Sequence, residues 1–269
     1  MKEIEANKRA WSLVARDHYE AFSARLREEH SLLNDIVTRE LGDLSGKKVI
    51  HLQCNTGADT LSLARMGARV TGVDLVPANV HYARKMAKEL GVENARFIES
   101  DVLALADIHG ERYDVVFTSE GAIGWLPDLH GWGHTIRHLL DDDGFFYIFD
   151  SHPFQLTFDE EKMSEDILEI AYPYFGREPD VDTRIGGYAS EAKDGVNYFW
   201  MYSVGDVINA LAGAGLHIEY FNEYDFLYFR LPGMEPVDKG LWRWPHYRGK
   251  LPFAFSLKAS VFRPVAGID

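Results

Sequence analysis

The chain has 269 residues, of which 46% are hydrophobic and 26% are charged, and its formal net charge is −14. This length suits one large α/β domain with additions, or two small domains. The acidic balance argues against a DNA or RNA substrate, which would need a basic surface, and it is compatible with a small-molecule substrate. The single cysteine, Cys54, excludes an internal disulfide and is typical of a reducing compartment.

Targeting and membrane signals are not expected from the sequence. The first residues, MKEIEANKRAW, carry too many charges for the apolar region of a signal peptide. No apolar run approaches the roughly 20 residues that a membrane helix needs. We therefore predict a cytoplasmic protein that has no membrane partner.

The first 41 residues are expected to form two helices that act as a cap. Apolar and aromatic side chains recur at helical spacing from Trp11 to Phe22, and a second helical segment covers about residues 31–41 before Gly42. Residues 48–74 then predict a strand, a tight loop at 53–57, a helix and a second strand that ends on Asp74. Such a unit requires parallel strands and a right-handed crossover. Its loop opens a helix at the carboxyl ends of the strands, where ligands bind in open α/β sheets.

The βα alternation continues to residue 151. We expect a helix at 78–90, strands at 96–99 and 113–118, a helix at 129–140, a turn at 141–144 and a strand at 145–150. Residues 152–202 interrupt the alternation, and they are rich in aromatic side chains, with a hairpin predicted around Asp194 and Gly195. A helix at 203–214, capped by Ser203 and Asp206, precedes two antiparallel strands at 216–224 and 253–262. The long loop between these strands is predicted to be a second lid element or an oligomer contact.

The order and spacing of these elements resemble the class I S-adenosylmethionine-dependent methyltransferases. The first motif of that family reads hydrophobic-hydrophobic-Asp-x-Gly-x-Gly-x-Gly; this chain has His51 for the acid, and Gln53, Asn55 and Gly57 for the glycines. Because Asn tolerates a left-handed backbone better than other non-glycine residues, we expect Asn55 to keep the turn. A nicotinamide-binding G-x-G-x-x-G pattern is not present in either register of this loop.

The resemblance implies a single domain over residues 1–269. It would be a Rossmann-like, seven-stranded, mostly parallel sheet with helices on both faces. Residues 1–41 would form the N-terminal helical cap, 42–151 and 203–262 the core, and 152–202 an inserted substrate lid. The implied cofactor is S-adenosyl-L-methionine. The implied cofactor-binding residues are Gln53, Asn55, Gly57, Asp74, Leu75, Asp101, Val102, Ser119 and Tyr19.

Four of these residues have specific expected contacts. Asp74 would accept hydrogen bonds from the ribose diol. Asp101 would accept from the adenine amine while the backbone of Val102 contacts the ring; the alternative for Asp101 is a helix N-cap. Tyr19 would reach the carboxylate of the cofactor; the alternative is that it only packs the cap onto the core.

Two residues at the carboxyl ends of strands are candidates for catalysis. Glu120 follows the fourth strand and could orient the acceptor or balance the sulfonium charge, or it could be a loop acid in solvent. His152 follows the fifth strand and has a pKa suited to proton transfer, or it could be a hydrogen-bonded structural histidine. The substrate pocket is predicted to include Trp125, Tyr198 and Trp200.

No metal is expected. His130, His134 and His138 have helical spacing, but no nearby cysteine or second carboxylate cluster completes a ligand set. The predicted function is methyl transfer to a small-molecule acceptor, and a homo-oligomer is compatible with the sequence. The alternatives are a non-catalytic S-adenosylmethionine-binding or regulatory protein and a nicotinamide-dependent oxidoreductase.

Overall fold

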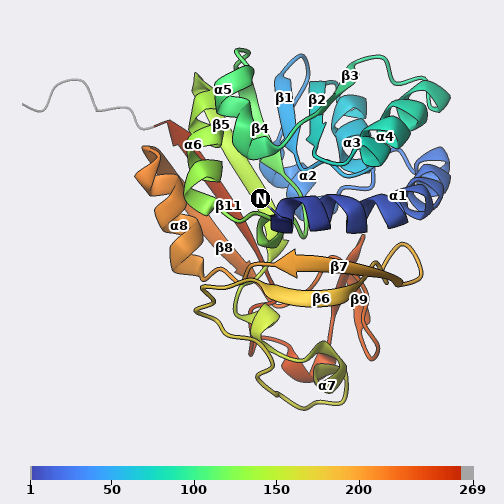
Figure 1. Ribbon diagram of the computed structural model, residues 1–269, viewed down its shortest axis with the longest axis vertical. Coiled ribbons are helices and arrows are strands. Elements are labelled where there is room, and N and C mark those ends of the chain that lie inside the picture. Colours follow the sequence, from blue (N-terminus) through green and yellow to red (C-terminus); the bar gives the residue numbers. More distant parts are fainter. Residues whose placement is uncertain (1, 262–269) are drawn as a thin grey trace, which may run out of the picture.

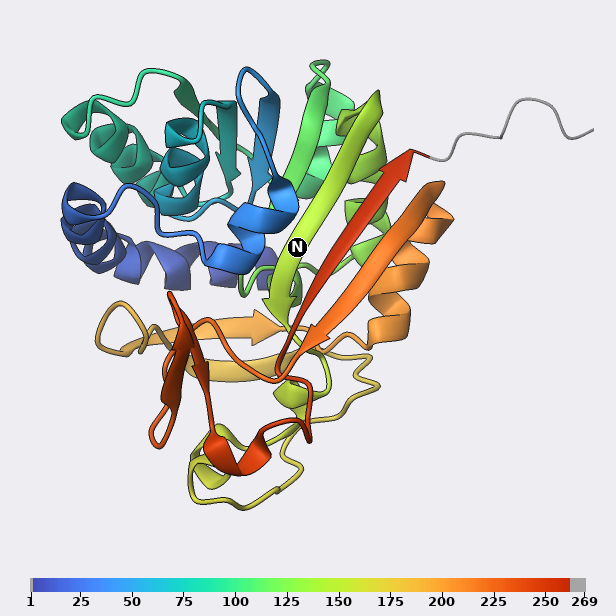
Figure 2. The same ribbon diagram turned by 180° about the vertical axis from the view of Figure 1, so that it is seen from behind.

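The computed structural model describes residues 2–261, and a seven-stranded sheet forms its centre (Figure 1, Figure 2). The strand order is β3-β2-β1-β4-β5-β11-β8. All strands run parallel except β11, which pairs antiparallel with both β5 and β8. The strands are β1 Lys48–Leu52, β2 Arg69–Asp74, β3 Ala95–Glu99, β4 Tyr113–Thr118, β5 Leu140–Ser151, β8 Leu216–Tyr224 and β11 Ala254–Val261. The predicted fold class is confirmed; Phe262, the last residue of the predicted final strand, lies outside the described residues.

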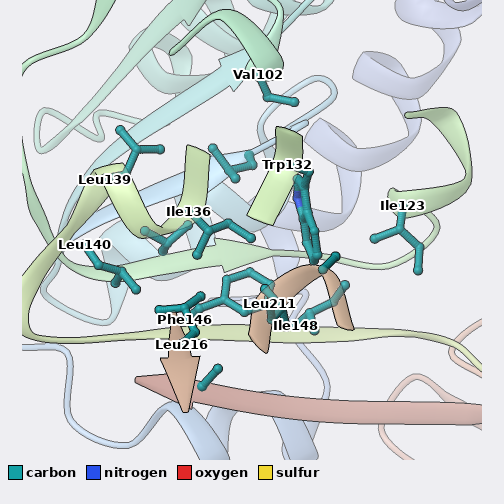
Figure 3. Close-up of a cluster of buried hydrophobic side chains, with 14 of the residues drawn as sticks. Val102, Ile123, Trp132, Ile136, Leu139, Leu140, Phe146, Ile148, Leu211 and Leu216 are labelled. Atoms are coloured by element: carbon teal, nitrogen blue, oxygen red, sulfur yellow. The ribbon is translucent and has the colours of Figure 1, made fainter. Parts of the chain in front are cut away.

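Helices cover both faces of the sheet because its central strands are apolar on both sides. One face packs on α2 (Asp35–Leu41), α3 (Ala58–Arg65) and α4 (Pro77–Glu89). The other packs on α6 (Leu129–Leu139) and α8 (Val204–Gly213), with the short α5 (Leu105–Ile108) beside them. Figure 3 shows this second core, where Trp132 and Ile136 of α6 lie near Phe146 of β5 and Leu211 of α8.

The N-terminal helices form as predicted, with one shifted boundary. Helix α1 covers Lys2–Glu28 and lies across the carboxyl ends of the parallel strands (Figure 1). The second predicted helix begins at Asp35 rather than near residue 31, because the Asn34 side chain accepts the N–H of Val37 at 2.9 Å and caps it.

The predicted turn at residues 141–144 is wrong. These residues are the irregular start of β5, whose register against β4 shifts between Tyr113 and Val115. A Cβ on Gly144 would lie 2.8 Å from the carbonyl oxygen of Tyr113, so the two backbones approach each other closely there. The predicted capping box of α8 is confirmed, since the Ser203 and Asp206 side chains each accept from the other residue's backbone N–H.

The insertion after β5 contains a hairpin, but its turn differs from the prediction. Strands β6 (Asp180–Ile185) and β7 (Lys193–Phe199) pair antiparallel, and the chain reverses at Gly186 and Gly187, which have φ angles of 97° and 108°. Gly195 lies inside β7, where a Cβ would be 3.0 Å from the Leu13 side chain of α1. The glycine therefore allows close approach to α1 and does not make the turn.

The connection between β8 and β11 is not a simple loop. It contains a second hairpin, β9 (Glu235–Asp238) and β10 (Leu241–Arg243). Its buried Trp244 and Phe253 pack with Phe158 and Met163 from the segment after β5, which also carries α7 (Glu160–Ser164). The insertion after β5 and the β8–β11 connection thus share a small core below the sheet (Figure 2). Within residues 2–261, no helix combines the length and apolarity that crossing a membrane requires.

Candidate cofactor and acceptor site

The loop between β1 and α3 holds three alternating residues in the left-handed region. Gln53, Asn55 and Gly57 have φ angles of 56°, 50° and 84°. The left-handed conformation predicted for Asn55 is confirmed. Gln53 shares this conformation, and its side-chain Nε2 donates to the Ala122 carbonyl at 2.8 Å. At Gly57 a Cβ would lie 2.8 Å from the Phe97 ring, so only glycine fits without displacing that ring.

Asp74 lies beside this loop at the end of β2 and is almost fully buried. Its Oδ2 accepts the backbone N–H of Asn55 at 2.8 Å, and its Oδ1 accepts from Val76 N and Asn79 Nδ2 at 2.9 and 3.1 Å. Burial raises the pKa of Asp74 to about 6, although these hydrogen bonds oppose the rise. Because a carboxylate oxygen accepts two hydrogen bonds, Oδ2 can take one further donor, such as a ribose hydroxyl.

Several buried polar atoms around this loop have no hydrogen-bond partner within residues 2–261. They are Gln53 Oε1 and Thr56 Oγ1 in the loop, Asn79 Oδ1 beside Asp74, and His18 Nε2 on α1. Buried polar atoms are normally satisfied, so atoms of this kind point to a polar ligand. The lining therefore fits a cofactor that combines a nucleoside with an amino acid.

The sheet brings the ends of β1, β2 and β3 together. Asp74 pairs with Glu99, and its carbonyl accepts the N–H of Ser100 at 3.0 Å, so residues 101 and 102 follow directly beside residues 74 and 75. The Asp101 side chain accepts from Leu103 N at 2.9 Å and caps a short 3₁₀ turn, which is the alternative role that the sequence suggested. Val102 is buried in the core, and its contact with adenine stays a prediction, as does that of Leu75.

His51, which replaces the acid of the family motif, is a neutral buried link. Its Nδ1 lies 2.9 Å from Thr60 Oγ1 and its Nε2 lies 2.9 Å from Ser119 Oγ. Burial lowers the pKa of His51 to about 3, so the ring is uncharged at neutral pH. Ser119, a predicted cofactor ligand, therefore already binds β1 through its hydroxyl.

Glu120 is held at the carboxyl end of β4. Its Oε1 accepts from Asn34 Nδ2 at 2.9 Å. The pKa of Glu120 is raised well above its usual range, mainly by burial and then by the negative charges of Asp59 and Asp150. Glu120 is half-buried and hydrogen-bonded, which favours a role at the site over that of a solvated loop acid.

Asp150 fixes the loop that carries Glu120. Its carboxylate accepts the backbone N–H groups of Gly121, Ala122 and Ile123 at 2.5, 3.2 and 3.4 Å. The hydroxyl of Tyr228, from the β8–β11 connection, lies 3.4 Å from the same carboxylate. Asp150 is a site residue that was not predicted, although it lies one residue before the carboxyl end of β5 and Asp74 lies at that of β2.

His152 lies on the other side of β5, against β8. Its Nδ1 accepts the N–H of Phe154 at 3.1 Å, and its Nε2 lies 3.0 Å from Glu223 Oε1. The ring is 3% exposed and packs edge-on against Phe221 and Phe255. Burial lowers the pKa of His152. This geometry favours a structural histidine, and the base role stays a prediction.

Tyr19 does not face the loop. Its hydroxyl donates to Glu89 Oε2 at 2.6 Å and its ring stacks on Tyr82, so it joins α1 to α4. The preceding residue, His18, contacts the loop instead through Asn55. The packing alternative therefore describes Tyr19, and the cofactor contact predicted for it is not supported by this geometry.

The predicted pocket residues lie where the β6–β7 hairpin meets α1 and the β4 loop. The Trp125 ring packs edge-on between Trp11 and Phe199. The backbone of Tyr198 exchanges two hydrogen bonds with the Asn7 side chain, and the N–H of Trp200 donates to the Gly124 carbonyl at 2.7 Å. Among the described residues, no group of three His, Cys, Asp or Glu side chains could hold a metal ion.

Known proteins resemble this chain over its core. Residues 43–176, about half of the chain, match the family model described as a methyltransferase domain. A ubiquinone biosynthesis O-methyltransferase of Salmonella paratyphi A is 34% identical over 108 residues, which are 40% of this chain and 44% of that enzyme. The chain thus spans less than half the length of the curated relatives it matches.

Two solved structures show the same fold at low sequence identity. One is an S-adenosylmethionine-dependent methyltransferase from Clostridium acetobutylicum, with a TM-score of 0.56, 15% identity, and coverage of 91% of this chain and 92% of that one. The other is the geranyl diphosphate C-methyltransferase of Streptomyces coelicolor, with a TM-score of 0.55, 14% identity, and coverage of 85% and 78%. With the sheet order, the left-handed loop and the matched domain, the chain belongs to the class I S-adenosylmethionine-dependent methyltransferases.

Proposed function

We propose that this protein transfers a methyl group from S-adenosylmethionine to a small-molecule acceptor. The observation that supports this most strongly is the loop of three left-handed residues, Gln53, Asn55 and Gly57, whose backbone is bonded to the buried Asp74. When bound, the cofactor supplies a methyl group on a positively charged sulfur. The protein then has to align the acceptor and exclude water.

The cofactor is proposed to lie along the ends of β3, β2, β1 and β4. Asp74 would accept a ribose hydroxyl through the free capacity of Oδ2, with Leu75 beside it. Asp101 and Val102 would contact adenine. The loop at 53–57 and Ser119 would hold the amino-acid end.

The acceptor is proposed to lie beside Glu120, below the ends of β4 and β5. Glu120 is the candidate general base because it is half-buried at this end of β4, and because burial and the charges of Asp59 and Asp150 raise its pKa and so strengthen its affinity for a proton. The rings of Trp125, Tyr198 and Trp200 would contribute to an apolar wall that excludes water. A base is needed only where the acceptor must lose a proton.

The test is a methyl-transfer assay on the full chain, using labelled S-adenosylmethionine and a panel of phenols, amines, thiols and carboxylic acids. For an acceptor that must lose a proton, Glu120→Gln should lower turnover by about 100-fold or more. His152→Gln should leave the turnover of folded protein near the wild-type value, because its Nδ1 accepts the backbone N–H of Phe154 and its ring packs against Phe221 and Phe255.

The opposite results would separate the two candidates. Unchanged turnover in Glu120→Gln would remove that residue as the base. A large loss in His152→Gln, at an unchanged melting temperature, would restore the base role to His152. Binding of the cofactor product without any methylated acceptor would favour the non-catalytic alternative.

We also propose a cytoplasmic protein that has neither a nucleic-acid nor a membrane partner. The free, buried thiol of Cys54 and the net charge of −14 support this proposal.

A further inference from the structure

His18 lies at a junction of three elements that are distant in the sequence. It belongs to α1 and is fully buried. Its Nδ1 lies 3.3 Å from Asn55 Nδ2 in the β1–α3 loop and 3.4 Å from the hydroxyl of Tyr188, in the turn of the β6–β7 hairpin. Tyr188 is 58% exposed, so this contact lies at the rim of the covered region.

The hydrogen bonds of Asn55 determine the protonation of the His18 ring. Asn55 Oδ1 accepts the N–H of Thr56 at 2.6 Å, which directs the NH₂ group of the amide toward His18. An NH₂ group only donates, so Nδ1 of His18 is the acceptor. In the neutral ring the proton is then on Nε2. Burial lowers the pKa of His18, which keeps this neutral form at pH 7.

The Nε2–H of His18 has no hydrogen-bond partner within residues 2–261. Leaving a buried donor unpaired is unfavourable, so a fully buried N–H of this kind is expected to meet a ligand. The surrounding rings of Trp11, Phe22 and Tyr188 pack edge-on against His18 and restrict its rotation.

The position of His18 indicates which part of the cofactor it meets. Asn55, its partner, also donates its backbone N–H to Asp74. Asn55 therefore links His18 to the proposed ribose site at Asp74. Asp74 is an acceptor and suits hydroxyl donors, whereas the His18 N–H needs an acceptor. In a region that carries the carboxylates of Asp59, Asp74 and Glu120, an anionic group on the ligand needs such a donor.

We infer that His18 is a positioning residue whose Nε2–H binds the carboxylate at the amino-acid end of the cofactor. This inference rests on the proposed function. It also gives the hairpin a role, because the Tyr188 hydroxyl bonds the same ring and helps to fix its orientation. His18 takes no part in the transfer of the methyl group itself.

The test compares two ligands by calorimetry on the full chain. S-adenosylhomocysteine has the amino-acid end, and 5′-methylthioadenosine has the same nucleoside but lacks that end. His18→Phe should weaken S-adenosylhomocysteine about 10- to 100-fold, as expected for a lost hydrogen bond to a charged group, and leave methylthioadenosine unchanged. His18→Gln, whose amide can place an N–H near the Nε2 position, should recover most of the affinity. Phe22→Leu disturbs packing at the same junction without removing a donor, and should affect both ligands alike or neither.

Each other outcome has a distinct meaning. Equal losses for both ligands in His18→Phe, or no loss for either, would overturn the role of His18. If the wild-type chain binds methylthioadenosine and S-adenosylhomocysteine equally well, no protein group recognises the amino-acid end, and the inference fails while nucleoside binding stands. Absence of binding of both ligands to the wild-type chain would instead contradict the proposed function.

Discussion

Asp74 is a buried carboxylate that three neutral donors hold, and its raised pKa has consequences for stability. The folded pKa is about 6, whereas an exposed aspartate titrates near 3.8. Between pH 4 and 6 the folded chain therefore keeps a proton that the unfolded chain releases. The free energy of unfolding should fall as the pH rises through this window, by about 3 kcal/mol from this residue alone, and the penalty is fully present above pH 6.

Asp74→Asn should remove this pH dependence. The variant loses hydrogen bonds at every pH, but the difference in stability between wild type and variant should change by about 2 kcal/mol between pH 4.5 and pH 7.5, with the wild type relatively less stable at the higher pH. Urea unfolding of the ligand-free proteins at both pH values measures it. All other carboxylates are common to the two proteins, so their contributions to the pH dependence cancel in the difference. Parallel pH profiles would show that Asp74 titrates as an exposed group.

At the residue scale, some of the site was predictable because its causes are local. The left-handed turn at Asn55 follows from the residue type and its place between a strand and a helix. Residue type does not determine whether His18 or Tyr19 faces the loop. Successive helical residues point about 100° apart, and only tertiary packing sets the rotation of α1 about its axis. Here Tyr82 and Glu89 on α4 bind Tyr19, which directs His18 to the loop.

At the element scale, the hairpin depends on contacts that sequence patterns do not contain. A hairpin was expected in this segment, but its turn was misplaced because Gly195 packs against α1 within β7. A second glycine, Gly124 in the β4 loop, has a comparable role. A Cβ there would lie 2.1 Å from the Phe199 ring, and the carbonyl of Gly124 accepts the N–H of Trp200 at 2.7 Å. Phe199 therefore cannot move away without breaking the link between hairpin and loop.

Gly124→Ala should loosen the hairpin. We expect a loss of about 1–3 kcal/mol, as for overpacking in a closely packed site, and faster proteolytic cleavage in residues 186–192. Limited proteolysis followed by mass spectrometry measures it. Gly213→Ala is the matched control, because it makes the same change in α8 where no atom lies within 4 Å of the added Cβ. Equal cleavage rates in both variants would contradict the proposed attachment.

At the scale of the whole molecule, the sheet and the cap differ in how far sequence predicts them. The sheet was predictable, since its strands are short apolar runs in a repeating βα order. The cap combines α1, the insertion after β5 and the β8–β11 connection. The insertion after β5 and the β8–β11 connection meet only in the folded chain, for example where Trp244 packs with Met163, so no local pattern predicts the core that these two segments share.

The proposed function depends on cofactor binding at the carboxyl ends of β1 and β2. Calorimetric titration of the full chain with S-adenosylhomocysteine, with NADH as the control, tests it most directly. We predict micromolar binding of S-adenosylhomocysteine, no binding of NADH, and affinity about 10- to 100-fold weaker in Asp74→Ala through loss of charged hydrogen bonds. No binding of S-adenosylhomocysteine, or equal binding of NADH, would contradict the account.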